Sequence, residues 1–485
     1  ILQIIIPLIS APLCVLLRRR WLTWAFAFLV SCATLVVSAL LLMRVLESGP
    51  ISYELGGWSP PWGIEYRVDA VNAFVLLLVS LIGAVVLLYA PDSVAREIPE
   101  RLHYLFYTSY LLCLTGLLGI TITGDAFNVF VFLEISALSS YILISLGQDR
   151  RALTAAYQYL VMGTIGATFI LIGIGLMYMM TGTLNMADLA TRLARVGDTR
   201  TILVAFGFLT VGMSLKLALF PLHMWLPNAY CYAPSVVTAF IASTATKVSI
   251  YVFLRFVFTM FGAGFAFETL HLDVFLLPLS LLGIFVASTV AIFQTNIKRM
   301  LAYSSIAQIG YMMLGISFVS VNGLTGGIVH LFNHALMKGA LFLAMGCIAL
   351  RIGSVNLEDM RGLGRRMPVT MAVFVFGGLS LIGVPLTVGF VSKWYFLLAA
   401  LEKGWWPVAF LLLVSSLLAV IYVWRVVEVA YFQKSDGEIE VREAPILMQI
   451  PMWILTGSIV FFGVQTSLTA GVARQAAEWL LGGTP

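Results

Sequence analysis

Apolar runs long enough to cross a lipid bilayer recur from one end of this sequence to the other. In hydrocarbon, every backbone N–H and C=O group must be hydrogen-bonded within the protein, so only helices or a closed barrel can cross. A barrel would show short segments in which apolar and polar residues alternate, and the sequence has none. Charged residues make up 11% of the 485 residues, against about 25% in soluble proteins. We therefore expect an all-α polytopic membrane protein.

About fourteen transmembrane helices are expected. The longest interior loop, 48–67, is too short to fold alone. The expected spans lie near residues 1–17, 21–44, 68–90, 104–122, 127–147, 154–180, 201–228, 234–258, 273–293, 299–320, 324–349, 369–398, 405–430 and 447–470.

The distribution of Lys and Arg between the loops predicts the orientation, because cytoplasmic loops carry the excess. One set of alternate loops holds roughly twice as many of these residues as the other. The richer set, which we assign to the cytoplasm, contains Arg18, Arg19, Arg20, Arg96, Arg101, Arg150, Arg151, Lys298, Arg299, Arg351, Arg361, Arg365, Arg366, Lys434 and Arg442. Both termini are then expected outside, in the plasma membrane of a prokaryote.

Several function classes find no support in the sequence. It contains no G-x-x-x-x-G-K-[ST] motif and no G-x-G-x-x-G motif after a strand, so neither nucleotide hydrolysis nor dinucleotide binding is indicated. The net charge of +5 follows from the membrane topology and does not suggest nucleic acid. The five cysteines form no C-x-x-C pair and are expected to be small buried residues. We expect no cofactor and no enzymatic activity.

Few charged residues lie within the expected spans at membrane depth. They are Glu134, Lys216, Lys247, Lys338 and Lys393. Each such charge costs roughly 2.5 to 3.5 kcal/mol at the centre of a bilayer. Lysine suits a proton relay, because a desolvated ammonium group releases its proton more easily and a nearby carboxylate retains it. Snorkelling or structural pairing is the alternative, and it suits Arg255 and Arg425, which lie nearer span ends.

The span 201–228 is predicted to be broken. Its stretch "SLKLALFPLHMWLPNAY" contains Lys216, Pro221 and His223, and the whole segment is about 40 Å long at 1.5 Å per residue. Pro221 cannot bond to the carbonyl of Leu217, so a freed carbonyl next to the lysine is expected to form a polar seat for it. A plain proline kink is the alternative.

The span 369–398 repeats this pattern. In "LIGVPLTVGFVSKWYF", Gly383 and Pro385 break the helix and Lys393 follows. Interrupted helices at matching places in two halves of a membrane protein point to a transport site.

The two breaks suggest an internal repeat. Residues 104–258 and 273–430 would each hold five helices, with the broken helix fourth in each. Because five is odd, the second unit enters from the opposite side, as in inverted-repeat transporters. Residues 1–103 would supply three helices before the repeats, and 447–485 a C-terminal helix after them.

The stretch "HLFNHALMKG" places His330, His334 and Lys338 four residues apart, on one face of a helix. Histidine titrates near neutral pH, so a histidine–lysine line inside a membrane can pass protons along. Core packing is one alternative. Metal binding is another, but only two ligands are visible and the next group on that face is a cation, so no metal is expected.

These stretches resemble the antiporter-like subunits shared by complex I and the Mrp cation/proton antiporters. The resemblance covers nearly the whole chain. It rests on "GDAFNVFVFLEISALSSY", "SLKLALFPLHMWLPNAY", "STATKVSIY", "NIKRMLAYSSIAQIGYM", "HLFNHALMKGALF" and "GFVSKWYF". It implies fourteen helices, two inverted five-helix repeats and two broken helices. It also implies a lateral proton route through Glu134, Lys216, Lys247, His330 or His334, Lys338 and Lys393. His223 of the first broken span is a further candidate for the proton pathway.

Within this family, "GGWSPPWGIEYRVDAVNAFVLL" and the end of the chain soon after the last span favour the MrpD-type subunits of the Na⁺/H⁺ antiporters. The resemblance then implies a proton-translocating subunit of a multisubunit antiporter, with other membrane subunits as partners and H⁺, and also Na⁺ if this subunit carries it, as cargo. The alternative is the proton-pumping membrane subunit of a redox-driven complex, complex I-like or a membrane-bound hydrogenase. A scaffold that transports nothing is a third class, in which neutral substitutions of the buried charges would be harmless.

The first broken span and the span 127–147 enter the membrane from the same side. By helical rise, Glu134 and Lys216 differ in depth by only about 7 Å. An unpaired charge at that depth is the costlier state. We therefore predict an ion pair between them.

Overall fold

The computed structural model describes residues 1–434 and 441–482, and nearly all of them are helical. The helices are α1 (Leu2–Leu17), α2 (Arg20–Ser48), α3 (Ala70–Glu97), α4 (His103–Ile122), α5 (Ala126–Ser145), α6 (Arg150–Thr181), α7 (Met186–Val196), α8 (Arg200–Leu217), α9 (Leu226–Tyr232), α10 (Ser235–Leu254), α11 (Leu272–Ile292), α12 (Ile297–Ser317), α13 (Val321–Ile352), α14 (Leu363–Arg366), α15 (Pro368–Ile382), α16 (Val388–Glu402), α17 (Trp406–Phe432), α18 (Ile446–Val464) and α19 (Thr466–Leu480). Short turns of helix lie at η1 (Leu55–Gly57), η2 (Glu100–Leu102), η3 (Arg255–Met260), η4 (Gly264–Thr269) and η5 (Leu357–Met360), and two strands at β1 (Ile51–Glu54) and β2 (Glu65–Val68).

The fourteen predicted spans match helices of this structure within the described ranges. Eleven spans match single helices, and the two that were predicted to be broken match the pairs α8/α9 and α15/α16. The last span, 447–470, covers α18 and the start of α19. Eleven helices among the described residues are long and apolar enough to cross a membrane, and α1 and α15 are shorter apolar helices. The helix α12 has 21 residues but is not among the eleven, because it contains more Ser, Gln and Tyr and is therefore less apolar. The all-α polytopic fold is thus confirmed.

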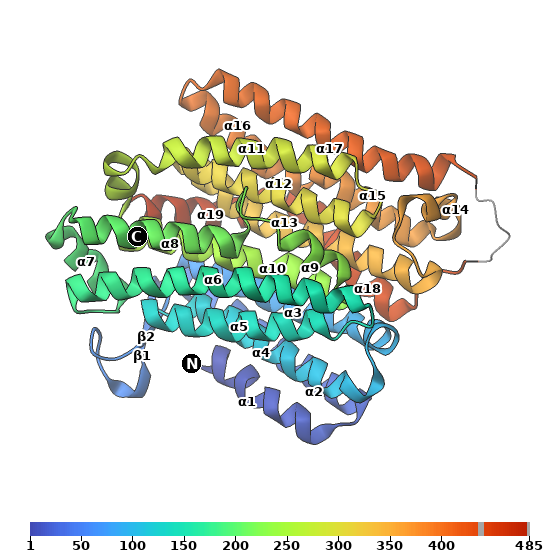
Figure 1. Cartoon of the computed structure of the whole chain (residues 1–485), viewed down its shortest axis with the longest axis horizontal. Coiled ribbons are helices and arrows are strands. Elements are labelled where there is room, and N and C mark those ends of the chain that lie inside the picture. Colours follow the sequence, from blue (N-terminus) through green and yellow to red (C-terminus); the bar gives the residue numbers. More distant parts are fainter. Residues whose placement is uncertain (435–440, 483–485) are drawn as a thin grey trace.

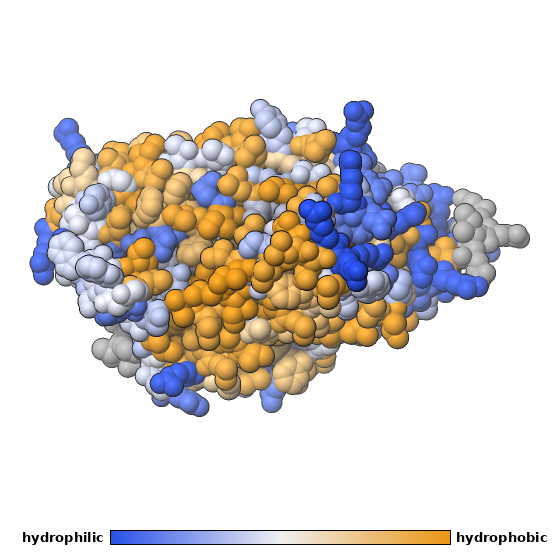
Figure 2. Space-filling view, turned by 90° about the horizontal axis from the view of Figure 1, so that it is seen from below, coloured by the Kyte–Doolittle hydropathy of each residue, from blue (hydrophilic) through white to orange (hydrophobic). Residues whose placement is uncertain are grey.

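Most helices run roughly along the long axis of the molecule (Figure 1). Apolar residues form a band across its middle, and hydrophilic residues gather toward both ends (Figure 2). One end carries β1, β2, α7 and α19, and we name it the hairpin end; both chain termini lie toward it (Figure 1). The other end carries α14 and the loops rich in arginine, and we name it the basic end.

The helix α13 is the centre of the bundle. It packs against α3, α10, α12, α15, α16, α18 and α19, and every residue from Gly323 to Ile348 is buried. A helix that is buried on all sides has no face for water or lipid. The polar side chains of "HLFNHALMKG" therefore lie in the middle of the protein.

The two halves of the chain share a constant spacing. The helices α6 and α13 each contain 32 residues, and α13 begins 171 positions after α6. Two pairs of backbone hydrogen bonds show the same spacing of 171 positions. One pair joins the loop before α5 to the loop after α6, and the other joins the loop before α12 to the loop after α13. The bonds are Ala126 N to Leu184 O and Met186 N to Gly124 O in the first half, and Ile297 N to Val355 O and Leu357 N to Thr295 O in the second. The same loop closure is therefore made twice.

Some elements differ from the prediction. The loop 48–67 forms an antiparallel hairpin, in which Ile51 pairs with Val68. The amphipathic helix α7 lies between α6 and α8, where no helix was expected. The expected C-terminal helix is two helices, since α18 ends at Val464 and α19 follows it. Amphipathic helices that lie along a surface contain too few consecutive apolar residues to be found in a search for membrane spans.

Candidate functional site

The first break lies between α8 and α9. The helix α8 ends at Leu217, four residues before Pro221, because Ala218 has left-handed backbone angles. The indole Nε1 of Trp225 donates a hydrogen bond of 3.0 Å to the carbonyl of Leu215. That carbonyl is thus occupied by a side chain from beyond the break, and Lys216 lies at the very end of the first segment.

Lys216 pairs with Glu134 of α5, as predicted: Nζ lies 3.6 Å from Oε1. The lysine side chain is 5% exposed and the glutamate side chain 28% exposed. Neither atom has a hydrogen-bond partner among the described residues. The expected carbonyl seat for Lys216 is therefore wrong, since a carboxylate alone neutralises its charge. At 3.6 Å the contact is an ion pair that is longer than a charge-assisted hydrogen bond.

Lys247 lies in the middle of α10 and is completely buried. Its ammonium group donates a short hydrogen bond to the carbonyl of Ala242 and one of 3.4 Å to the hydroxyl of Thr246. Within the described residues it forms no ion pair, so uncharged oxygens alone hold this cation.

His330 and His334 lie one turn apart on α13, with ring centroids 6.0 Å apart and planes nearly parallel. His330 Nδ1 shares a hydrogen bond of 2.7 Å with the hydroxyl of Ser392, and Nε2 donates 2.8 Å to Oε1 of Gln308. Both nitrogens of His334 have no hydrogen-bond partner among the described residues. His330 is thus anchored between α12 and α16, and His334 is available to a water or to a neighbouring donor.

Lys338 lies one further turn along α13. Its ammonium group donates 2.8 Å to the carbonyl of Leu301 and a shorter bond to the hydroxyl of Ser304, both on α12. It also lies 6.0 Å from the ring centroid of Phe342. Like Lys247, it forms no ion pair within the described part of the chain.

The second break separates α15 from α16, and Lys393 of α16 folds back onto it. Its ammonium group donates to the freed carbonyls of Leu381 at 3.2 Å and Ile382 at 2.9 Å, and to the hydroxyl of Ser416 at 2.9 Å. Here the expected carbonyl seat is present. Gly383 has a positive φ of 92°, and a Cβ at that position would lie 2.8 Å from Cδ of Lys393. Only glycine leaves room for the lysine, while Pro385 lies in the turn that follows.

His223 lies within the first break and is buried. Its ring stacks on Phe220 with centroids 5.3 Å apart and meets the edge of Tyr303 at 6.4 Å. Its Nδ1 has no partner among the described residues. No described hydrogen bond joins His223 to Lys216 or Lys247. The structure therefore does not connect His223 to the other predicted residues.

Five of the predicted residues form one cluster, which we name the row: Lys247, His330, His334, Lys338 and Lys393. No described hydrogen bond or ion pair joins them to Lys216 or Glu134. Lys247, Lys338 and His330 all lie within electrostatic range of His334, and Lys393 within range of His330. The row also depends on partners that sequence reasoning missed. These are the uncharged groups Ala242, Thr246, Leu301, Ser304, Gln308, Ser392 and Ser416, which hold the titratable residues in place.

The fold and this row define a class: polytopic helical membrane proteins with two interrupted spans and a row of buried ionisable residues between them. The chain belongs to the NADH:quinone oxidoreductase/Mrp antiporter transmembrane family, whose model matches residues 123–419.

Similar proteins come from both branches of that family. The N subunit of the NADH-quinone oxidoreductase of Desulforudis audaxviator is 40% identical and covers 99% of each chain. The D subunit of the Na⁺/H⁺ antiporter of Bacillus subtilis is 32% identical over 99% of this chain and 97% of its own length. A chain of the archaeal membrane-bound sulfane sulfur reductase is 31% identical, with a TM-score of 0.91 and coverage of 99% and 97%. A chain of the Dietzia Mrp complex shares the fold, at 24% identity, with a TM-score of 0.89 and the same coverage.

Proposed function

We propose that this chain is the proton-translocating subunit of a multisubunit monovalent cation/proton antiporter. The observation that carries the proposal is the set of three lysines that are held by uncharged oxygens alone within the described residues. Lys247 and Lys338 are fully buried, and Lys393 is partly buried. Each buried charge costs roughly 2.5 to 3.5 kcal/mol on insertion scales. A fold that only needed packing would be more stable with leucine at these positions.

The arrangement suits proton transfer along the row. Carbonyl and hydroxyl oxygens accept hydrogen bonds from an –NH₃⁺ group and, more weakly, from an –NH₂ group, so each lysine has an acceptor in both protonation states. The carboxylate of Glu134 favours the charged form of Lys216, and any lengthening of that ion pair favours release. His334, whose two nitrogens have no partner among the described residues, can carry a proton between Lys247 and Lys338.

We further infer the placement of the chain in the membrane. The Lys/Arg-rich basic end would face the cytoplasm of a prokaryote, and the hairpin end with both termini would face outside. Residues 104–258 and 273–430 would be the two inverted repeats, between the segments 1–103 and 447–485. The repeated loop closure at a constant spacing supports this division. The chain would itself catalyse no reaction and work with other membrane subunits.

A second candidate is the proton-pumping membrane subunit of a redox-driven complex. The 40% identity to the N subunit of a NADH-quinone oxidoreductase favours it. The same row of residues would serve either assembly. Purification of the native complex separates the two candidates: small multi-span partners alone indicate an antiporter, and copurifying iron–sulfur proteins indicate the redox class.

Transport is tested by exchange in membrane vesicles that contain the native complex, with a pH-sensitive dye in the lumen and a cation pulse outside. His334→Ala is expected to slow exchange by at least about tenfold, because the residue offers two nitrogens to the row. His330→Ala should vary more with conditions, because a water can replace its bonds to Gln308 and Ser392. A His334→Ala variant that exchanges at the parent rate would remove this histidine from the row.

Lys338→Arg is expected to lose more activity than its conserved charge suggests, by about tenfold or more, because guanidinium does not release its proton. The measurement is the same exchange rate at matched expression. Lys338→Arg with full activity would mean that Lys338 acts only through its charge.

A further inference from the structure

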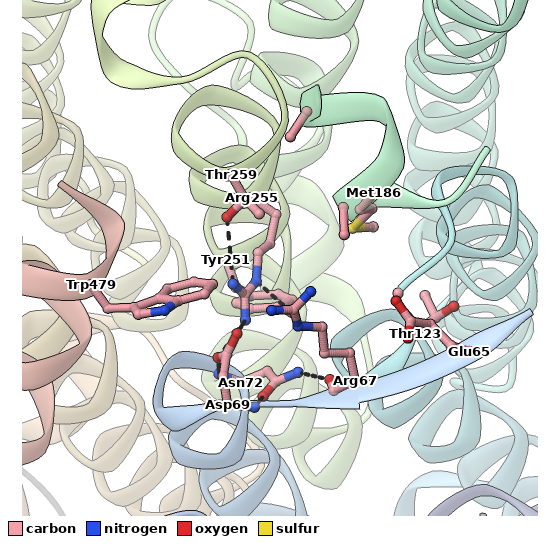
Figure 3. Close-up of a pocket in the computed structure, with 13 residues that line it drawn as sticks. Glu65, Arg67, Asp69, Asn72, Thr123, Met186, Tyr251, Arg255, Thr259 and Trp479 are labelled. Carbon is pink, nitrogen blue, oxygen red and sulfur yellow. Dashed lines mark hydrogen bonds and ion pairs between the residues drawn. The ribbon is translucent and has the colours of Figure 1, made fainter. Parts of the chain in front are cut away.

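A charged cavity of about 250 Å³ lies at the hairpin end and takes no part in the row. Its walls come from β2, the start of α3, α7 and the last turns of α10, and Trp479 of α19 closes one side (Figure 3). Glu65, Asp69 and Arg255 line it and are themselves buried. Burying two carboxylates and a guanidinium together carries a desolvation penalty, which indicates that these charges have a role beyond packing.

Arg255 is held from several sides. Its Nη2 donates to both carboxylate oxygens of Asp69 at 2.6 Å, and its Nε donates to the hydroxyl of Tyr251 at 3.0 Å. The guanidinium also lies 5.2 Å from the ring centroid of Tyr251 and 5.3 Å from that of Trp479. A planar guanidinium gains from all these contacts at once, whereas an ammonium group would not. This is the structural pairing that the position of Arg255 near a span end predicted.

The same helix leads from this pair to the row. Lys247, Tyr251 and Arg255 follow one another at intervals of four residues, so they lie along one side of α10, about 12 Å apart from first to last. The hydroxyl of Tyr251 accepts from Nε of Arg255 and donates 2.9 Å to the carbonyl of Thr121. At Arg255 the backbone changes from α-helix to the wider π-helix, a change found frequently at functional sites.

We propose that the Asp69–Arg255 pair is the gate between the row and the hairpin-end surface; this rests on the proposed function. While the pair is formed, the guanidinium blocks the way past Tyr251, and its charge opposes the approach of a proton. Tyr251 already lines the cavity. When Arg255 leaves Asp69, the Tyr251 hydroxyl is released from the guanidinium Nε, and a proton can pass from Nζ of Lys247 through water and this hydroxyl to the cavity and the surface. Each oxygen on the way accepts one proton and releases another, so no other bond changes.

Asp69 also caps α3, since its Oδ1 accepts from the backbone N–H groups of Val71 and Asn72. Asn is as good as Asp at the N-cap. The variant Asp69→Asn therefore keeps the cap and the side-chain shape and removes the charge that holds Arg255. Arg255→Lys is the second variant, because it keeps the positive charge but loses the separate nitrogens that donate to Tyr251 and Thr259 while Nη2 binds Asp69.

Accessibility tests the gate without any measurement of transport. Thr259→Cys places a thiol on the cavity wall, and Thr246→Cys places one beside Nζ of Lys247, behind the gate. In the assembled complex, a membrane-impermeant methanethiosulfonate cation from the hairpin side should modify Cys at 259 but not at 246. Adding Asp69→Asn should speed modification at 246 by at least about tenfold, since removing one partner of a buried ion pair strongly destabilises the other. Arg255→Lys should give a smaller increase.

Passive proton leak across the membrane of the same vesicles is the second measurement. Asp69→Asn should raise the leak, and adding Lys247→Ala should abolish the increase, because the leak must pass through the row. Arg474→Gln is the matched control. It breaks the exposed Arg474–Glu478 pair of 3.0 Å on α19, near Trp479, and should change neither reading.

Two results would overturn the gate. One is unchanged modification at position 246 in assembled Asp69→Asn complexes, which would leave the pair with a purely structural role. The other is a leak that persists in the Asp69→Asn, Lys247→Ala double variant. If instead the proposed function fails, Lys247→Ala has no effect on exchange, while modification at 246 still reports whether the pair closes the cavity.

Discussion

Lys247→Ala is expected to abolish cation-dependent proton exchange while the complex still assembles. The lysine is the titratable side chain that α10 contributes to the row, and it lies within electrostatic range of His330, His334 and Lys338. In the proposed function, removing it would take away the proton acceptor that α10 supplies. A loss of about a hundredfold or more is expected, because a single positioned proton-transfer group contributes about that much. The measurement is exchange in vesicles at matched amounts of complex.

The thermal stability of the Lys247→Ala complex should not fall with its activity. The alanine removes a buried cation, so thermal unfolding of the assembled complex should occur at the parent temperature or above it. Lys403→Ala is the matched control, because Lys403 is an exposed lysine that rests on Trp405. It should retain exchange. Near-normal exchange by Lys247→Ala at the parent level of expression would exclude a central role for this residue.

The second large effect concerns the Glu134–Lys216 pair. Glu134→Gln is expected to stop exchange with little loss of fold, because Lys216 would then lose the anion with which it pairs and hold its proton less tightly. Glu134→Asp, one methylene shorter, should retain partial activity with a shifted pH optimum. Both follow from a contact that is 3.6 Å long and, among the described residues, has no other hydrogen bond to stabilise either atom.

A double-mutant cycle measures whether the two residues act together. Exchange is measured across pH for Glu134→Gln, Lys216→Ala and the double variant. We expect a coupling free energy of at least about 1 kcal/mol, within the usual range for residues in contact. The exposed pair Asp149–Arg151, at 2.7 Å, supplies the control cycle and should give no coupling in exchange. Independent multiplication of the two losses at Glu134 and Lys216 would mean that the pair has no role in transport.

Much of the fold could be predicted from the sequence, because hydrocarbon allows only one kind of solution. A run of apolar residues without charges has to be a helix, so the spans were found to within a few residues. The helices α7 and α19 could not be found in this way. Their apolar residues cover one face only, and a single face is equally consistent with a loop that folds against the protein surface.

The titratable residues of the site could also be predicted, because a charge within an apolar run is conspicuous. Their partners could not. Gln308, Ser392 and Ser416 are ordinary polar residues in the sequence, and only the packing of α12, α16 and α17 places them against His330 and Lys393. Breaks were predicted from proline and glycine, yet α8 stops at Ala218, whose left-handed backbone a sequence rule does not foresee.

The direction in which the row runs has an electrical consequence. Lys247, His334, Lys338 and Lys393 lie near the middle of their helices or beside a helix break, so in the proposed function the row would extend across the bundle and along the plane of the membrane. A charge that moves at constant depth does no work against the membrane potential. Only a step toward a surface does, at about 2.3 kcal/mol for each 100 mV crossed by a full charge. The way from Lys247 to Arg255 covers about 12 Å of a core roughly 30 Å thick, so that step carries roughly 1 kcal/mol for each 100 mV. Voltage would therefore act on the passage past Tyr251 and leave transfer along the row unaffected.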